Sequence, residues 1–344
     1  MRLTSIAAGL VILTLAGIPA LSAVVSRPLA AQDQSQQSSQ QGQVPQSSQT
    51  LKSGVALVNV FATVRDKHHS IVSGLTKDDF KVYEDGVEQK VAFFSKEMNL
   101  PITLGILIDT SGSQQNLLNA EQDTASRFVH EIMRKRDEAI VISFDTDVNL
   151  LADFTEDPGV LERAIRRTQI NAVGAGGVVT PGTVPQGNNA GGTNFYDAVY
   201  LACHDELSTE AGRKAIIVLT DAEDTGSKLS LNEAIESAER ADTVVHVLLL
   251  SDVMGYFSQG MGYSGGAVAN KIANDTGGRV VAVRSEKSLD KAFDELVEEL
   301  RSQYVISYYP SNEKKDGTFR KIKVETTHDD FKALARRGYY APSH

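Results

Sequence analysis

The sequence predicts an α/β protein: a doubly wound, mainly parallel sheet in the middle of the chain and a small β-sandwich formed by the strands on either side. Three observations support this prediction. The middle of the chain alternates continuous apolar runs with amphipathic stretches, which is typical of parallel strands covered by helices on both faces. Both flanks instead show the alternation of half-buried strands. The hydrophobic content of 41% is enough for a core of this size.

Residues 1–31 are predicted to be a secretory signal peptide. Arg2 precedes an apolar run from Ile6 to Val25, and Ala30-Ala31 supplies small residues before a polar stretch. An uncleaved anchor is the alternative, because the run is nearly long enough to span a bilayer. Pro19 interrupts it and favours cleavage. We therefore expect a secreted, periplasmic or cell-envelope protein, with no membrane insertion after the signal is removed.

Residues 32–54 are predicted to be a disordered linker. The segment is almost entirely Gln and Ser as far as about Thr50. Such a composition has no apolar surface to bury and cannot offset the entropy of ordering. It would let the folded part stand away from a surface.

Residues 55–97 are predicted to form the first part of a β module. An apolar face alternates through Val58, Val60, Ala62 and Val64. Asp85-Gly86 follows a strand at Lys81–Tyr83 and precedes another strand from Val91 to Phe94, which indicates a hairpin turn. This segment is too short to hold a core by itself.

Residues 100–303 are predicted to form the α/β domain. Its strands are expected at Ile102–Ile108, Ala139–Phe144, Ala215–Leu219, Val244–Leu250 and Val280–Val283. Helical spacing of apolar residues occurs from Leu118 to Ile132 and from Leu289 to Leu300. The turn Asp145-Thr146-Asp147 should add one antiparallel edge strand.

Residues 304–341 are predicted to complete the β module. Strands are expected at Tyr304–Tyr309, at Phe319–Thr326 and from Ala333 to Tyr340. Neither terminal β segment buries enough surface alone, so we expect them to pair into one sandwich of about six strands.

Polar side chains gather where the predicted strands end. Asp109, Ser111 and Ser113 follow the first strand of the α/β domain, Asp221 follows the strand at Ala215–Leu219, and Thr193 precedes a helix. Ligands of an open parallel sheet bind beyond the carboxyl ends of its strands. These side chains should therefore meet at one edge.

An oxygen-only set of hydroxyls and carboxylates suits a hard cation, Mg²⁺ above all, with Ca²⁺ or Mn²⁺ as alternatives. The set contains only two carboxylates, so a bound cation would keep a residual positive electrostatic field. It would also keep an exchangeable coordination position for a carboxylate from outside. The alternative without a metal is that Asp109, Ser111 and Ser113 only cap a helix. Thr193 and Asp221, placed on the right elements, favour the metal site.

This pattern resembles the metal-ion-dependent adhesion site of von Willebrand factor A-type domains, whose fold is Rossmann-like. The likeness covers about Ile102 to Gln303. The resemblance implies that the hydroxyls of Ser111, Ser113 and Thr193 reach the metal, while Asp109 and Asp221 act directly or through water. The chain as a whole, with its Arg336-Arg337-Gly338-Tyr339-Tyr340 ending, resembles the acidobacterial VWFA-related family.

The composition narrows the class of partner. The chain has 34 basic and 44 acidic residues, a net charge of -10, whereas nucleic acids and anionic membranes require a basic footprint. The resemblance implies a cation-dependent adhesion protein whose partner, a protein or an extracellular-matrix or glycan ligand, presents a carboxylate. The single cysteine, Cys203, allows no intramolecular disulfide.

Two other functions stay open. A structural envelope scaffold would use the metal only for stability. A hydrolase is the other alternative: the string G-x-S-x-G occurs once, at residues 262–266, but the sequence contains no Walker A or H-E-x-x-H string and no zinc-type Cys/His cluster. The Gly-rich segments 174–192 and 254–266 are long, and their role is also open.

Overall fold

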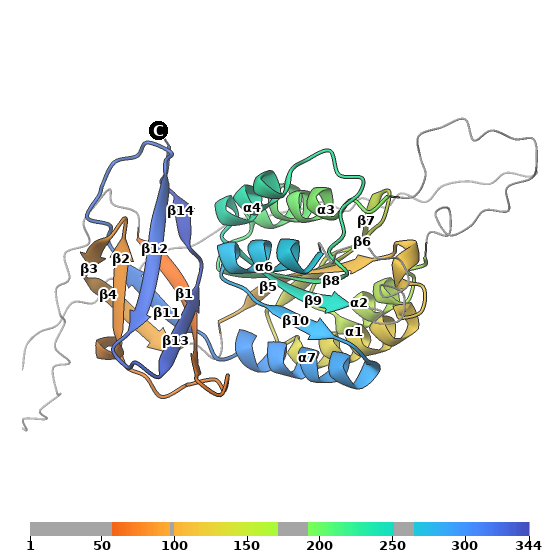
Figure 1. Ribbon diagram of the computed structural model, residues 1–344, viewed down its shortest axis with the longest axis horizontal. Coiled ribbons are helices and arrows are strands. Elements are labelled where there is room, and N and C mark those ends of the chain that lie inside the picture. The colour runs from red at the N-terminus through yellow and green to blue at the C-terminus, as the bar shows by residue number, and fades with distance from the viewer. Residues whose placement is uncertain (1–56, 97–99, 171–191, 251–264, 344) are drawn as a thin grey trace, which may run out of the picture. The chain divides into compact units, whose positions relative to one another are not determined.

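The computed structural model describes residues 57–96, 100–170, 192–250 and 265–343 (Figure 1). The predicted signal peptide (1–31), the Gln/Ser linker (32–54) and nearly all of segments 174–192 and 254–266 lie outside these residues. Within the described part of the chain, no helix is both long and apolar enough to cross a membrane.

A six-stranded sheet forms the centre of the α/β domain, in the order β10-β9-β8-β5-β6-β7. Its strands are β5 (Ile102–Asp109), β6 (Glu138–Phe144), β7 (Val148–Thr155), β8 (Arg213–Thr220), β9 (Thr243–Leu250) and β10 (Val280–Val283). All neighbours are parallel except β7, which runs antiparallel to β6. The predicted sheet and its antiparallel edge strand are confirmed.

Helices cover both faces of this sheet (Figure 1). One face carries α1 (Leu118–Ile132), α2 (Pro158–Ile165) and α7 (Glu286–Leu300), and the other carries α3 (Phe195–Leu201), α4 (Leu231–Arg240) and α6 (Gly265–Thr276). Each group of helices has its own buried apolar cluster against the sheet. Phe128 of α1 and Phe293 of α7 lie with ring centroids 4.7 Å apart. The double winding is therefore that predicted from the sequence.

The flanking segments form two antiparallel four-stranded sheets, β13-β1-β11-β4 and β14-β12-β2-β3. Their strands are β1 (Val58–Asp66), β2 (Phe80–Glu84), β3 (Val87–Gln89), β4 (Val91–Lys96), β11 (Tyr304–Tyr308), β12 (Phe319–Thr326), β13 (Phe331–Ala335) and β14 (Gly338–Tyr340). N-terminal β1 pairs with C-terminal β11 and β13, and β2 pairs with β12. Both sheets contribute to one apolar core. The predicted sandwich of N- and C-terminal strands is confirmed.

Two details of the sandwich differ from the sequence prediction. The single strand expected from Ala333 to Tyr340 is two strands, β13 and β14, which lie in different sheets. The chain crosses between the sheets at Arg336 and Arg337, where Arg337 forms ion pairs with Glu239 (2.9 Å) and Asp275 (3.0 Å) of the α/β domain. The hairpin turn at Asp85-Gly86 is present, with positive φ at both residues, but it leads into the short β3, which the sequence did not suggest.

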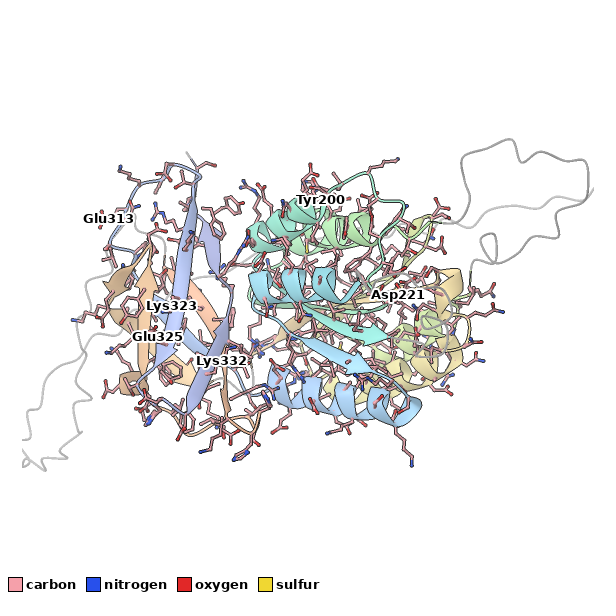
Figure 2. All side chains as sticks on the ribbon, viewed as in Figure 1. Tyr200, Asp221, Glu313, Lys323, Glu325 and Lys332 are labelled. Carbon is pink, nitrogen blue, oxygen red and sulfur yellow. The ribbon has the colours of Figure 1, made fainter. Side chains whose placement is uncertain are left out.

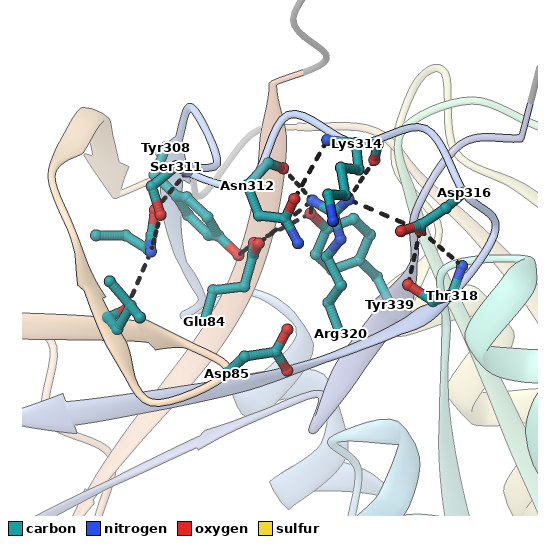
Figure 3. A network of polar contacts seen from close by, with 12 residues as sticks. Glu84, Asp85, Tyr308, Ser311, Asn312, Lys314, Asp316, Thr318, Arg320 and Tyr339 are labelled. Atoms are coloured by element: carbon teal, nitrogen blue, oxygen red, sulfur yellow. Dashed lines mark hydrogen bonds and ion pairs between the residues drawn. The ribbon is translucent and has the colours of Figure 1, made fainter.

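A buried polar network also joins the two terminal segments (Figure 3). Glu84, at the end of β2, forms an ion pair with Arg320 of β12 at 3.4 Å. The hydroxyls of Tyr308 and Tyr339 donate to the Glu84 carboxylate at 2.8 Å and 3.0 Å. The Arg320 guanidinium also donates to the carbonyl oxygen of Asn312. Breaking one partner of such a buried pair leaves an uncompensated charge, so the network requires both segments.

Candidate metal centre

The predicted ligands lie at the point where the strand order reverses. β5 lies between β6 and β8 and is parallel to both, with Ile108 opposite Leu219 of β8. Asp109 ends β5, and Asp221 follows directly after β8, so both are at the carboxyl edge of the sheet. Figure 2 shows Asp221 at the end of the sheet toward which the strand arrows point. Crevices at such reversals are the usual ligand sites of open α/β sheets.

Asp109 is fully buried and held at both carboxylate oxygens. The backbone N–H of Ser111 donates to Oδ1 at 2.9 Å, and the Thr220 hydroxyl donates to Oδ2 at 2.6 Å. Each oxygen of a carboxylate can accept about two hydrogen bonds, so both retain a lone pair. The Asp109 carboxylate is therefore held in a fixed orientation and can still bind a cation.

The Ser111 and Ser113 hydroxyl oxygens lie 3.0 Å apart. Mg–O bonds of about 2.0–2.1 Å at right angles put neighbouring ligand oxygens about 3 Å apart. The two hydroxyls therefore have the spacing of adjacent ligands in an octahedral shell. Ser111 is buried and Ser113 is exposed, so this side of the site opens toward solvent.

Thr193 and Asp221 are connected through the segment that follows β8. The Asp221 carboxylate accepts from the backbone N–H of Glu223 at 3.0 Å. The backbone N–H of Thr193 donates to the Thr225 hydroxyl at 2.9 Å, and the Thr225 N–H donates back to the Thr193 carbonyl at 3.1 Å. The residues after Asp221 thereby fix Thr193, just before α3.

The predicted hairpin between β6 and β7 supports the site from the other side. The Thr110 hydroxyl donates to the Asp145 carboxylate at 2.8 Å. Asn194 donates through its backbone N–H to the Asp145 carbonyl at 2.7 Å and through its side-chain amide to the Thr146 carbonyl at 2.6 Å. Residues adjacent to Asp109 and Thr193 are thus tied to one turn.

Burial and neighbouring negative charge raise the pKa values of two carboxyl groups, Asp109 and Glu121. Burial raises the pKa of Asp109 to about 7, and the negative charge of Asp221 adds to this shift against the hydrogen bonds from Ser111 and Thr220. Burial also raises the pKa of Glu121, in α1, well above its ordinary value, with further contributions from Asp109 and Asp221. Like charges disfavour one another's ionised form, and a divalent ion would remove that penalty.

Sequence reasoning missed two buried groups beside these ligands, Gln114 and Glu121. Glu121 lies three residues after Leu118, on the buried face of α1. A charged residue among the apolar positions of a helix was the signal that could have found it. Within the described residues, no three His, Cys, Asp or Glu side chains converge closely enough to hold a metal. A metal at the predicted site would therefore need the hydroxyls of Ser111, Ser113 and Thr193 as well as the carboxylates.

Residues 104–223 match the family model of the von Willebrand factor type A domain. The chain therefore carries such a domain, and the matched residues include all five predicted ligands. No match was found among curated proteins.

Several solved structures are similar to this chain. The von Willebrand factor type A protein from Catenulispora acidiphila is 11% identical, over 85% of this chain and 75% of that one, with a TM-score of 0.46. BatB from Bacteroides thetaiotaomicron is 21% identical over 58% of this chain and 100% of that one, with a TM-score of 0.42. The proximal thread matrix protein 1 from the mussel byssus, with a zinc-occupied MIDAS motif, is 14% identical over 63% of this chain and 49% of that one, with a TM-score of 0.45.

Proposed function

We propose that this chain is an exported, non-enzymatic binding protein that holds a Mg²⁺-class cation and offers it to an acidic group of a partner. Asp109, Ser111, Ser113, Thr193 and Asp221 would hold the ion. Ca²⁺ and Mn²⁺ are hard cations of the same class and suit the same oxygens. The bound ion would supply a positive field at the exposed side of the site.

The observation that carries this proposal is the pairing of two buried carboxylates, Asp109 and Asp221, at neighbouring strand ends. Burial and mutual repulsion disfavour ionisation of Asp109. A cation reverses that balance, because a metal ligand must be deprotonated and binding displaces its proton. The 3.0 Å spacing of the Ser111 and Ser113 hydroxyls supports an octahedral ion beside them.

An acidic partner follows from the charge of the site. Two carboxylates cancel the formal charge of a divalent ion. The hydroxyl ligands are neutral, so the ion can still attract a further anion. Ser113 is exposed, so a partner can approach from that side. A protein, matrix or glycan ligand with a carboxylate fits, and the predicted signal peptide would deliver the chain to such ligands outside the cytoplasm.

A binding role is supported over catalysis by the partners of the serines. The Ser111 and Ser113 hydroxyls contact each other, and the Gln114 amide donates to Ser113 at 3.3 Å. Among the described residues no histidine is hydrogen-bonded to either serine, so they contain no Ser–His pair of the kind that activates a serine nucleophile.

Peptide capture tests the proposal. Immobilised wild-type protein is exposed to a library of Asp- and Glu-containing peptides and to matched Asn and Gln peptides, in Mg²⁺ and then in EDTA. We expect retention of acidic peptides only, with release by EDTA. Thr193→Ala should weaken capture more than Mg²⁺ binding, since the resemblance implies that this hydroxyl joins the shell in the engaged state. The control is Thr209→Ala, at an exposed threonine.

The other outcomes are also informative. Capture of Asn and Asp peptides alike, or capture that survives EDTA, contradicts the carboxylate mechanism. Mg²⁺ binding that raises the melting temperature without any capture favours the structural scaffold.

A further inference from the structure

We propose that Glu121 and Gln114 form an outer shell of the metal centre, in which their oxygens accept hydrogen bonds from water molecules bound to the cation. This inference rests on the proposed metal site. It adds two residues outside the five-residue motif and gives the site a third negative charge that acts through water.

Unpartnered buried oxygens are the first argument. Glu121 has 0% of its surface exposed, and neither of its carboxylate oxygens has a hydrogen-bond partner among the described residues. Gln114 is 2% exposed, and its side-chain carbonyl oxygen likewise has none. Buried polar groups are nearly always hydrogen-bonded, and an unsatisfied one costs about 1–3 kcal/mol, more if charged. Two such residues in one short segment indicate partners beyond the described residues, and water is the partner that we infer.

Their location is the second argument. The Gln114 amide nitrogen donates to the hydroxyl of Ser113, a predicted ligand, so its carboxamide is at the site. Glu121 is on the buried face of α1, and the negative charges of Asp109 and Asp221 contribute to its raised pKa. The Gln114 carboxamide is therefore in contact with a predicted ligand, and Glu121 is within electrostatic reach of two others.

The chemistry of the atoms is the third argument. All three unpartnered atoms, Gln114 Oε1, Glu121 Oε1 and Glu121 Oε2, are acceptors. A water molecule that binds a metal donates an oxygen lone pair to the ion, and both of its hydrogens point away from the ion. These hydrogens therefore need hydrogen-bond acceptors nearby. Mg²⁺ characteristically keeps several waters, and carboxylates in the outer shell orient them.

Direct coordination by Glu121 is the competing arrangement. The described residues contain no three acidic, His or Cys side chains placed to hold one ion together. Glu121 together with Asp109 and Asp221 would be such a group. This spacing argues against a direct bond from Glu121 to an ion that Asp109 and Asp221 hold, and contact through water is the arrangement that we propose.

Metal titration of Glu121→Gln tests the inference. The substitution keeps the shape and removes the charge. We expect Mg²⁺ and Mn²⁺ affinity, measured by calorimetry, to fall by about 10- to 100-fold. Gln114→Ala should lower the affinity by a smaller factor, since it removes a neutral acceptor. Glu131→Gln, the same change at an exposed position of α1, should leave the affinity unchanged. The metal-free Glu121→Gln protein should melt at or above the wild-type temperature, since a buried acid without a partner is removed.

The number of waters on bound Mn²⁺, obtained from water-proton relaxation, separates the two arrangements. An outer-shell Glu121 leaves that number unchanged in Glu121→Gln, whereas a gain of one water would show direct ligation and overturn the proposal. Affinities equal to wild type in both the Glu121 and Gln114 variants would also overturn it. Neither result would contradict the proposed function. The proposed function is contradicted if the wild-type protein binds no divalent ion.

Discussion

At the scale of single residues, Asp109 illustrates how the fold prepares a ligand. Its two oxygens accept hydrogen bonds from Ser111 and Thr220, which come from distant parts of the sequence. Burial next to Asp221 makes the charged form of Asp109 unfavourable without a cation. The orientation of both oxygens and the raised pKa are what the proposed metal site would require of Asp109.

Asp79 connects the two terminal segments, and the pH dependence of folding stability tests its contribution. Its carboxylate accepts from the Thr76 N–H at 2.7 Å and contacts His328 of the C-terminal segment at 2.8 Å. These hydrogen bonds, led by that from Thr76, lower the pKa of Asp79 from 3.8 to about 2. A lowered folded-state pKa stabilises the protein above the unfolded value, and that stability is lost as the pH falls through the folded value.

We therefore expect the stability difference between wild type and Asp79→Asn to be constant above about pH 5 and to shrink between about pH 4 and pH 2. Urea denaturation at each pH measures it. Asp78→Asn, at the exposed neighbouring position, should show no such acid dependence. A wild-type advantage that persists unchanged at pH 2 would contradict the account of Asp79.

The predictability of the site also differs from residue to residue. Asp109, Ser111 and Ser113 could be predicted as ligands because they are close in sequence and follow an apolar strand. Asp221 was found from its position after another strand, and the structure places it at the same edge as Asp109. Glu121 was not found, because helical periodicity says which face is buried but not that an acid on that face has no partner.

At the scale of elements, the close approach of α6 to the strand end of β8 positions the site. A Cβ at Gly265, the first residue of α6, would lie 2.1 Å from the Asp221 carbonyl oxygen. No side chain fits there without movement of the backbone. The next residue after Asp221, Ala222, has a φ of 58°, so this turn is already in the left-handed region.

Gly265→Ala should push the Asp221 turn outward. We expect a loss of about 1–3 kcal/mol of stability, as in other overpacked sites, together with weaker Mg²⁺ binding. Denaturant unfolding and calorimetric titration measure the two effects. Gly74→Ala, where a Cβ would meet nothing within 4 Å, is the control. Unaltered metal affinity in Gly265→Ala would show that α6 does not set the position of Asp221.

Long elements were predictable and short ones were not. β5 is buried at all eight of its residues, and such a continuous apolar run is easily recognised. β3 and β14 have three residues each, too few to show a period. The division of β13 from β14 coincides with the ion pairs of Arg337 with the α/β domain, which are tertiary contacts that no local pattern contains.

At the scale of the whole molecule, the sandwich requires both ends of the described chain. β11 lies between β1 and β4, and β12 between β2 and β14, so the C-terminal strands are internal neighbours of the N-terminal ones. Apolar alternation in two separate short segments made this pairing predictable in general. The strand order was not predictable, because register depends on cores such as that of Tyr304, Phe80 and Phe94, whose rings pack at 5.2–5.7 Å.

Deleting the residues after Gln303 should therefore expose the N-terminal strands. The truncation removes β11 and β12, together with the Arg320 partner of Glu84. We expect rapid protease cleavage between Val58 and Phe94, which mass spectrometry of the fragments would locate. Removal of the last three residues alone should leave this region protected. Protection in the longer truncation would mean that the N-terminal strands fold independently.

Divalent-cation binding by the strand-end cluster can be measured by calorimetric titration of wild type and Asp109→Ala with Mg²⁺ and Mn²⁺. Asp109→Ala removes a fixed carboxylate and one of the two charges of the motif, while the apolar clusters beneath the site are untouched. We expect one ion per wild-type chain, no binding by Asp109→Ala, and a folded variant by circular dichroism. Equal binding by both proteins, or binding by neither, would contradict the account.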